Sequence, residues 1–172
     1  MSVELKPTTA DDYEEYYKIR CDHGDVYWNG YESAPDKETF RNIFLNRLGN
    51  TMLINPGDRR IYLIQNKGEN VGFLQLIKRE DGIDIGYTVD ERNHRKGYAT
   101  SALEKGVGLA QKIDDRVYVQ IRDDNVASQG VALKCGFTRT DEYTEVDYPN
   151  AGVVKLRKFR FINQNVINDS FV

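Results

Sequence analysis

The sequence predicts a mixed α/β domain with a central, mostly antiparallel mixed sheet of about seven strands, flanked by about four helices. Two observations predict this class. Strand patterns follow one another between residues 60 and 89, and from residue 99 onward helix and strand patterns alternate. Strands in a row followed by strands alternating with helices are typical of a mixed sheet with helices packed on its faces.

Apolar alternation and turn residues predict the strands. Val3 and Leu5 flank Glu4, and the segments RIYLIQ and VGFLQLIK are joined by NKGEN, which is a hairpin signal. Residues 83–89 alternate apolar side chains with Asp84, Gly86 and Thr88. The predicted strands are 3–5, 60–65, 71–78, 83–89, 117–121, 137–146 and 153–162.

Helical spacing and caps predict four helices. Thr9 followed by Asp12 resembles a capping box that opens a helix to about Cys21. Phe40, Phe44 and Leu48 are spaced four apart. The predicted helices are 9–21, 37–48, 99–110 and 125–134, and the Gly- and aromatic-rich segment 22–36 is predicted to be an irregular loop.

Composition limits the function classes. The chain has 172 residues, 40% apolar and 30% charged, which fits one domain over residues 1–172. A net charge of −3 and a pI of about 5.5 argue against a nucleic-acid-binding protein. No run reaches the ~18 apolar residues of a membrane helix, the N-terminus does not resemble a signal peptide, and Cys21 and Cys135 are far apart. We expect a cytoplasmic monomer or homodimer without a bound metal.

The clearest local chemistry is the turn HRKGYAT, residues 94–100, between a strand and a helix. A helix N-terminus offers free N–H groups and partial positive charge, and glycine lets an anion approach the backbone closely. Together with Arg92, Arg95 and Lys96 this predicts a pyrophosphate site. The turn is neither GxxxxGK[ST] nor GxGxxG, and a solvated basic turn is the alternative interpretation.

Two motifs in register resemble the GNAT acetyltransferase superfamily. Its coenzyme A turn has the pattern Gln/Arg-x-x-Gly-x-Gly/Ala, to which Gly97 and Ala99 conform while His94 replaces the first residue. Its next strand is followed by Asn-x-x-Ala/Ser and a Lys-x-Gly-Phe ending, which are present here as NVAS from Asn125 and KCGF from Lys134. The resemblance covers residues 61–137 best and points to the branch of ribosomal-protein and polyamine acetyltransferases.

The resemblance implies where acetyl-CoA binds. Its pyrophosphate would lie on the turn, its pantetheine arm would lie beside the strand at Tyr87, and Asn125 would hydrogen-bond the arm near Ser128. The implied cofactor-binding residues are Tyr87, Thr88, Val89, His94, Arg95, Lys96, Gly97, Tyr98, Ala99, Thr100, Asn125, Ser128 and Lys134.

Catalytic candidates are fewer. Many family members carry a tyrosine as general acid at the position of Ala132, so Ser128 is the substitute candidate, with a helix-capping role as the alternative. An alkyl amine has a pKa near 10, so a carboxylate would help to remove its proton. Asp84 is the first candidate base, with a surface Asp on a sheet face as the alternative. Glu142, Glu145 and Asp147 could enter the same cleft, although a solvent-exposed position is the favoured interpretation for each.

The segment 22–36 supplies the predicted acceptor wall, in which Tyr27, Trp28 and Tyr31 would bind substrate. Aromatic faces and carboxylates suit a cationic amine or an amino sugar, whereas the aromatic residues could equally cover the core. The acceptor could be a polyamine or small amine, an amino sugar, or a peptide amine.

The predicted function is direct transfer of an acetyl group from acetyl-CoA to a primary amine. One alternative is a non-catalytic coenzyme-A-binding sensory or structural module, which the absent tyrosine at Ala132 would suit. A nucleotide-binding regulator using the turn HRKGYAT is the other.

Overall fold

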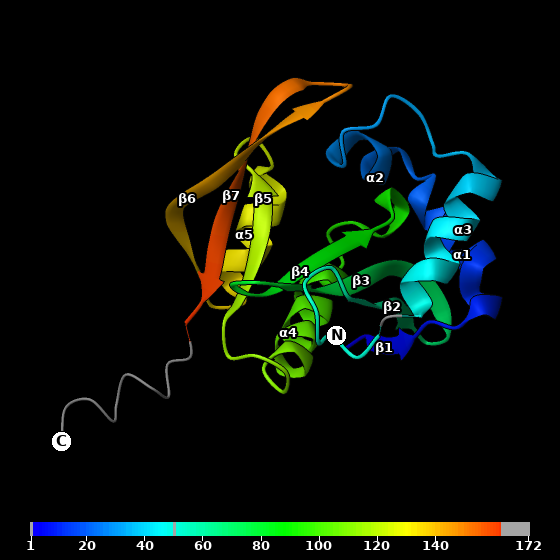
Figure 1. The fold of residues 1–172 in the computed structure, drawn as a ribbon, viewed down its shortest axis with the longest axis horizontal. Coiled ribbons are helices and arrows are strands. Elements are labelled where there is room, and N and C mark those ends of the chain that lie inside the picture. The colour runs from blue at the N-terminus through cyan, green and yellow to red at the C-terminus, as the bar shows by residue number, and fades with distance from the viewer. Residues whose placement is uncertain (1, 50, 163–172) are drawn as a thin grey trace.

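Seven strands form one sheet, ordered β1-β2-β3-β4-β5-β7-β6, in the computed structural model, which describes residues 2–49 and 51–162 (Figure 1). The strands are β1 (Glu4–Pro7), β2 (Arg59–Asn66), β3 (Glu69–Arg79), β4 (Gly82–Val89), β5 (Val117–Arg122), β6 (Phe137–Tyr148) and β7 (Gly152–Phe161). The helices are α1 (Tyr13–Arg20), α2 (His23–Trp28), α3 (Lys37–Leu48), α4 (Tyr98–Ala110) and α5 (Val126–Lys134).

Neighbouring strands are antiparallel except at the centre, where β4 and β5 run parallel. The helix α4 connects these two strands, as a parallel pair requires. Consecutive strands β2, β3 and β4 form a meander, and β6 and β7 form a long hairpin beside β5 (Figure 1). The predicted mixed, mostly antiparallel sheet is therefore confirmed.

Two apolar clusters hold helices on opposite faces of the sheet. On one face Tyr16 of α1 and Phe44 of α3 pack against Phe73 of β3, with the Tyr16 and Phe73 ring centroids 4.9 Å apart. On the other face Leu103 of α4 packs in the larger cluster that contains Ile85. Because side chains alternate along a strand, Asp84, Gly86 and Thr88 point toward the α1–α3 face.

The segment 22–36 contains a helix, so its prediction as an irregular loop was wrong. α2 begins after Asp22, whose carboxylate accepts a hydrogen bond from the Gly24 N–H at 3.1 Å. An N-cap satisfies a free backbone donor, and here it outweighs the Gly and aromatic content of the segment. The described residues thus hold five α-helices rather than about four.

The other predicted elements lie where expected. The Thr9–Asp12 pair caps the start of the helical segment, since Asp12 accepts a hydrogen bond from the Thr9 N–H at 2.9 Å, although the first turn is a 3-10 helix (Ala10–Asp12) that precedes α1. Of the predicted domain 1–172, residues 1, 50 and 163–172 lie outside the described part. In that described part, no helix is long and apolar enough to cross a bilayer.

Candidate active site

The central strands separate after two residue pairs. β4 and β5 pair only at Ile83 with Val117 and at Asp84 with Tyr118. Beyond these pairs, residues 85–89 of β4 and 119–122 of β5 share no ladder, and we call this divergence the β4–β5 opening. Backbone N–H and C=O groups need partners, so the free edge of β4 can pair with an extended molecule that carries amides.

A turn with two left-handed residues lies at the end of β4. Arg95 has φ +60° and Gly97 has φ +80°, and a Cβ on Gly97 would meet no atom within 4 Å. The first main-chain bond of α4 runs from the Ser101 N–H to the Gly97 carbonyl at 3.1 Å. The N–H groups of residues 98–100 precede it and are therefore available to an anion at the N-terminus of a thirteen-residue helix.

Side chains in the turn stabilise the turn itself. His94 Nε2 lies 2.8 Å from the Val89 carbonyl oxygen, and Lys96 Nζ donates to Asn93 Oδ1 at 2.8 Å. Tyr98 is buried, and its hydroxyl accepts a hydrogen bond from Asn66 at 2.9 Å. These three predicted cofactor residues can thus offer backbone groups while their side chains hold the loop. His94, Arg95 and Lys96 are all exposed, whereas Tyr98 is buried.

The α5 helix forms the other wall of the β4–β5 opening. Its N-cap Asn125 is buried, and the Asn125 Oδ1 accepts the Ser128 N–H at 3.1 Å. The capping bond at this position is therefore made by Asn125, with the main chain of Ser128 as donor. At the other end of α5, the Cys135 thiol lies 3.5 Å from the carbonyl of Thr100 in α4, and the neighbouring Lys134 is exposed.

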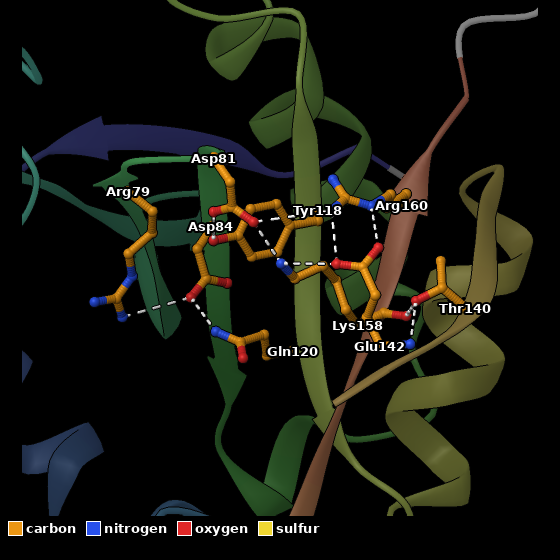
Figure 2. A network of polar contacts seen from close by, with 9 residues as sticks. All are labelled: Arg79, Asp81, Asp84, Tyr118, Gln120, Thr140, Glu142, Lys158 and Arg160. Carbon is orange, nitrogen blue, oxygen red and sulfur yellow. Dashed lines mark hydrogen bonds and ion pairs between the residues drawn. The ribbon is translucent and has the colours of Figure 1, made fainter. Parts of the chain in front are cut away.

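Asp84 lies at the vertex of the opening, where β4 and β5 last pair (Figure 2). Its side chain is buried, so the interpretation as a surface residue was wrong. Gln120 Nε2 donates to Asp84 Oδ2 at 3.0 Å, and Arg79 Nη2 lies 3.6 Å from the same oxygen. Burial raises the pKa of Asp84, while Gln120 and Arg79 oppose that rise.

A charged network extends from the vertex across β5, β7 and β6 (Figure 2). Tyr118 donates to Asp81 at 2.8 Å, Lys158 Nζ contacts Asp81 and lies 3.4 Å from Glu142, and Arg160 donates twice to Glu142 at 2.8 Å. Glu142, one of the three further carboxylates that could enter the cleft, belongs to this network. Glu145 pairs with Lys155 and Asp147 with Val153, and these pairs point to the opposite face. All three carboxylates are exposed, as the favoured interpretation expects.

Two residues of the predicted acceptor wall surround a buried cation, Arg122. The Arg122 guanidinium carbon lies 5.3 Å from the Tyr27 ring centroid, 5.0 Å from that of Trp28 and 5.8 Å from that of Tyr148. Arg122 also donates twice to Asp124, at 3.0 and 2.7 Å. Tyr31, the third predicted acceptor residue, contacts a different cation, because its ring centroid lies 5.7 Å from the guanidinium carbon of Arg20.

The hairpin tip of β6 and β7 contacts the end of α2 and the residues that follow it. Asn150 Nδ2 donates to the Tyr27 carbonyl at 2.9 Å, and the Asn150 N–H donates to the Gly30 carbonyl at 3.3 Å. Gly30 has φ +84°, and a Cβ there would lie 2.3 Å from the Tyr148 ring. The wall is thus joined to β6–β7 on the α1–α3 face, the face toward which Asp84 points.

Gln120, Lys158 and Arg122 were not predicted from the sequence as site residues. Gln120 and Arg122 alternate with Val119 and Ile121 on β5, which marks them as one face of that strand. That face could have been linked to Asp84 only with the parallel pairing of β4 and β5 in hand. The segments 2–49 and 51–162 contain no group of three or more His, Cys, Asp or Glu residues that could hold a metal ion.

A sheet that opens beside the free N-terminus of a helix has room for an extended molecule with an anionic group at one end. A family described as Acetyltransferase (GNAT) domain matches residues 2–138. The chain therefore belongs to the GNAT acetyltransferase family and is an acyltransferase by class. No curated protein sequence matches the chain.

Solved structures share the fold. The acetyltransferase that modifies the N-terminal serine of a 50S ribosomal subunit protein from Salmonella typhimurium is 22% identical, covering 95% of this chain and 96% of that one, with a TM-score of 0.75. Spermidine N-acetyltransferase from Vibrio cholerae in complex with coenzyme A and spermine is 13% identical, covering 95% and 96%, with a TM-score of 0.76. The structure of AAC(6')-Ib in complex with ribostamycin and coenzyme A is 18% identical, covering 100% and 99%, with a TM-score of 0.73.

Proposed function

We propose that this chain transfers the acetyl group of acetyl-CoA directly to a primary amine of a small molecule or a peptide. The observation that carries the proposal is the β4–β5 opening, with its free edge on β4. At its end lie residues 94–100, which we call the phosphate turn. Coenzyme A has a pyrophosphate and an amide-bearing arm, which fit these two features. Solved structures of the same fold that contain coenzyme A support this assignment.

The residues of the turn would hold the pyrophosphate. The N–H groups at 98–100 and the left-handed conformation at Gly97 provide donors without a side chain in the way. Arg95 adds a positive charge in an exposed position. His94, Lys96 and Asn93 would act as positioning residues, since their side chains hold the turn in shape.

The vertex would hold the reacting groups. An arm that extends along β4 from the turn ends toward Asp84, on whose face the acceptor wall also lies. An incoming ammonium must lose a proton before it attacks the thioester carbonyl. Asp84 would accept that proton, directly or through a water, because desolvation makes its carboxylate a better base than a solvated one.

The acceptor would approach between α2 and the β6–β7 hairpin. Tyr27 and Trp28 offer aromatic faces, and Arg122 holds both rings together with Tyr148. Such a wall suits an amine that carries ring or apolar surface next to its reactive nitrogen. Among the solved structures of this fold, one enzyme modifies the N-terminal serine of a ribosomal protein, one is bound to spermine and one is bound to ribostamycin. All three classes of amine therefore belong in the test.

The test is release of free thiol from acetyl-CoA with spermine, ribostamycin and a peptide with a free N-terminal serine, with the acetylated amine confirmed by mass. We expect turnover with at least one amine. Binding of coenzyme A without turnover on any amine would instead favour a sensory or structural module, which the buried Ala132 in place of the usual tyrosine makes worth testing. Thermal protection by ATP but not by coenzyme A would favour a nucleotide-binding regulator.

A further inference from the structure

A hydrogen bond from a tyrosine hydroxyl joins the two walls of the β4–β5 opening, β4 and α5. Tyr87 pairs with Leu74 of β3 but lies beyond the pairs that β4 makes with β5, and its phenol oxygen donates to the Ser128 carbonyl at 3.2 Å. Ser128 is in the first turn of α5, which follows β5. The phenol therefore extends below the opening, and the side chain remains partly exposed.

Tyr87 and Asp84 lie on opposite faces of the same strand. Asp84 points toward the α1–α3 face, whereas Tyr87 packs against the cluster on the α4–α5 face. An acyl group held between them would meet the amine from one face and have its sulfur toward the other. Attack and departure at a thioester carbon use different sides of that carbon, which suits this arrangement.

The position of the usual acid is filled by a small side chain. Ala132 is fully buried and lies one helical turn after Ser128 on α5. Ala132 and Cys135 belong to the core cluster against which Tyr87 packs. A tyrosine at position 132 would need room at this cluster, and the ring of Tyr87 already contacts the cluster from the strand side.

The hydrogen bond of Tyr87 is easily exchanged. At 3.2 Å it is longer than the 2.5–3.0 Å typical of O–H donors, so a small rotation can redirect the hydroxyl to a closer acceptor. Burial raises the pKa of Tyr87, and the nearby Cys135 adds to that rise, so the phenol keeps its proton at neutral and mildly alkaline pH.

We propose that Tyr87 is the general acid of the acetyl transfer, in place of the tyrosine that is missing at position 132. This proposal rests on the function proposed above. As the tetrahedral intermediate collapses, the C–S bond breaks and its electron pair stays on sulfur, which takes the phenolic proton of Tyr87. The phenolate then takes a proton from water, while the proton lost by the amine leaves through Asp84.

The test compares Tyr87→Phe with Ser128→Ala, using the amine of the panel that turns over fastest. Tyr87→Phe keeps the ring and removes only the hydroxyl, so we expect kcat to fall by about 10²-fold, within the usual range for a general acid. The dissociation constant for coenzyme A, measured by titration, should change by less than about threefold. Tyr143→Phe, which removes an exposed hydroxyl on β6, should match the wild type, whereas a loss in Ser128→Ala as large as that in Tyr87→Phe would assign the acid to Ser128 instead.

A second variant keeps the hydroxyl and changes its acidity. A fluorinated tyrosine placed at position 87 should alter kcat at least about twofold, because proton donation depends on the acidity of the donor. The proposal is overturned if Tyr87→Phe keeps kcat within about threefold, if coenzyme A binding weakens as much as kcat falls, or if Ser128→Ala carries the loss. A wild-type protein that acetylates no amine would overturn the proposed function and Tyr87's role with it, whereas an active wild type with an unaffected Tyr87→Phe overturns only the latter.

Discussion

The two sides of the β4–β5 opening differ in their chemical groups, because one is formed by main-chain atoms and the other by side chains. The proposed cofactor side is a local stretch of main chain, in which Gly97 and the first amides of α4 would supply the binding groups. The proposed acceptor side is a set of side chains from strands distant in sequence, in which Asp84 contacts Gln120 and Arg122 contacts the aromatic rings. A site made of main chain is encoded locally, whereas a site made of side chains depends on the topology of the sheet.

Asp84 provides the strongest test of the acceptor side. We expect Asp84→Asn to lower kcat by about 10²- to 10⁴-fold, as loss of a general base does, while the affinity for coenzyme A stays the same. The measurement is thiol release with the best amine of the panel. Glu145→Gln is the matched control, because Glu145 is an exposed carboxylate that points to the opposite face.

The pH dependence tests the same assignment. A base must be ionised to act, and burial raises the pKa of Asp84, so activity should fall as the pH is lowered through that raised pKa. In Asp84→Asn this acid limb should disappear from the profile of kcat. A variant with the wild-type rate and the wild-type limb would remove Asp84 from the mechanism.

Gly97 provides the next largest effect, on the cofactor side. A left-handed φ of +80° costs an L-residue about 1–2 kcal/mol, so Gly97→Ala should weaken coenzyme A binding roughly 5- to 30-fold if the turn relaxes. Gly108→Ala is the control, since a Cβ at either glycine meets no atom within 4 Å but Gly108 lies inside α4. That control should leave binding unchanged and stabilise the fold by about 0.5–1 kcal/mol. Equal affinities in calorimetric titrations of the two variants would contradict the role of the left-handed turn.

These two regions also differ in how far the sequence predicted them. The turn was predicted from a short pattern, because helix starts and glycine turns act over a few residues. The helix cap after β5 was considered only for Ser128, whereas the capping side chain is that of Asn125. The helix α2 was missed because Asp22 caps a segment whose composition is typical of a loop. The hydrogen bond between Asp84 and Gln120 could not be predicted from the sequence, because 36 residues separate them and only the parallel pairing of β4 and β5 brings them together.

A substitution of Arg122 tests whether the proposed acceptor wall acts on the amine alone. We expect Arg122→Met, which keeps apolar bulk but removes the cation over three rings, to raise the KM of the amine about tenfold. The KM of acetyl-CoA should change by less than about twofold, because the phosphate turn is built by other residues. Arg139→Met, which removes an exposed arginine paired with Asp123 at 3.4 Å, is the control. A rise in KM for both substrates would indicate a general loss of structure rather than a role in the acceptor wall.

Asp114 gives the smallest effect on activity and separates stability from catalysis. Its side chain accepts hydrogen bonds from Lys78 at 2.8 Å and from Arg116 at 2.9 and 3.0 Å, and these partners hold the pKa of Asp114 well below its usual range. The native state therefore binds this proton less readily than the unfolded state, and stability falls as the pH drops below about 4. We expect Asp114→Asn to lower the free energy of unfolding at pH 7 by about 1–2 kcal/mol, and the difference from wild type to shrink toward pH 3.

The free energy of unfolding, measured for both variants by urea titration, should respond in the opposite way to the substitution of Asp84. Burial is the largest influence on it and raises its pKa, so its charge is costly in the folded protein at neutral pH. Asp84→Asn should consequently keep or increase the free energy of unfolding while it removes activity, whereas Asp114→Asn should keep kcat and lose stability. If Asp84→Asn instead unfolded as readily as Asp114→Asn, its loss of activity would reflect a structural role, and the acceptor side would lose its proposed base.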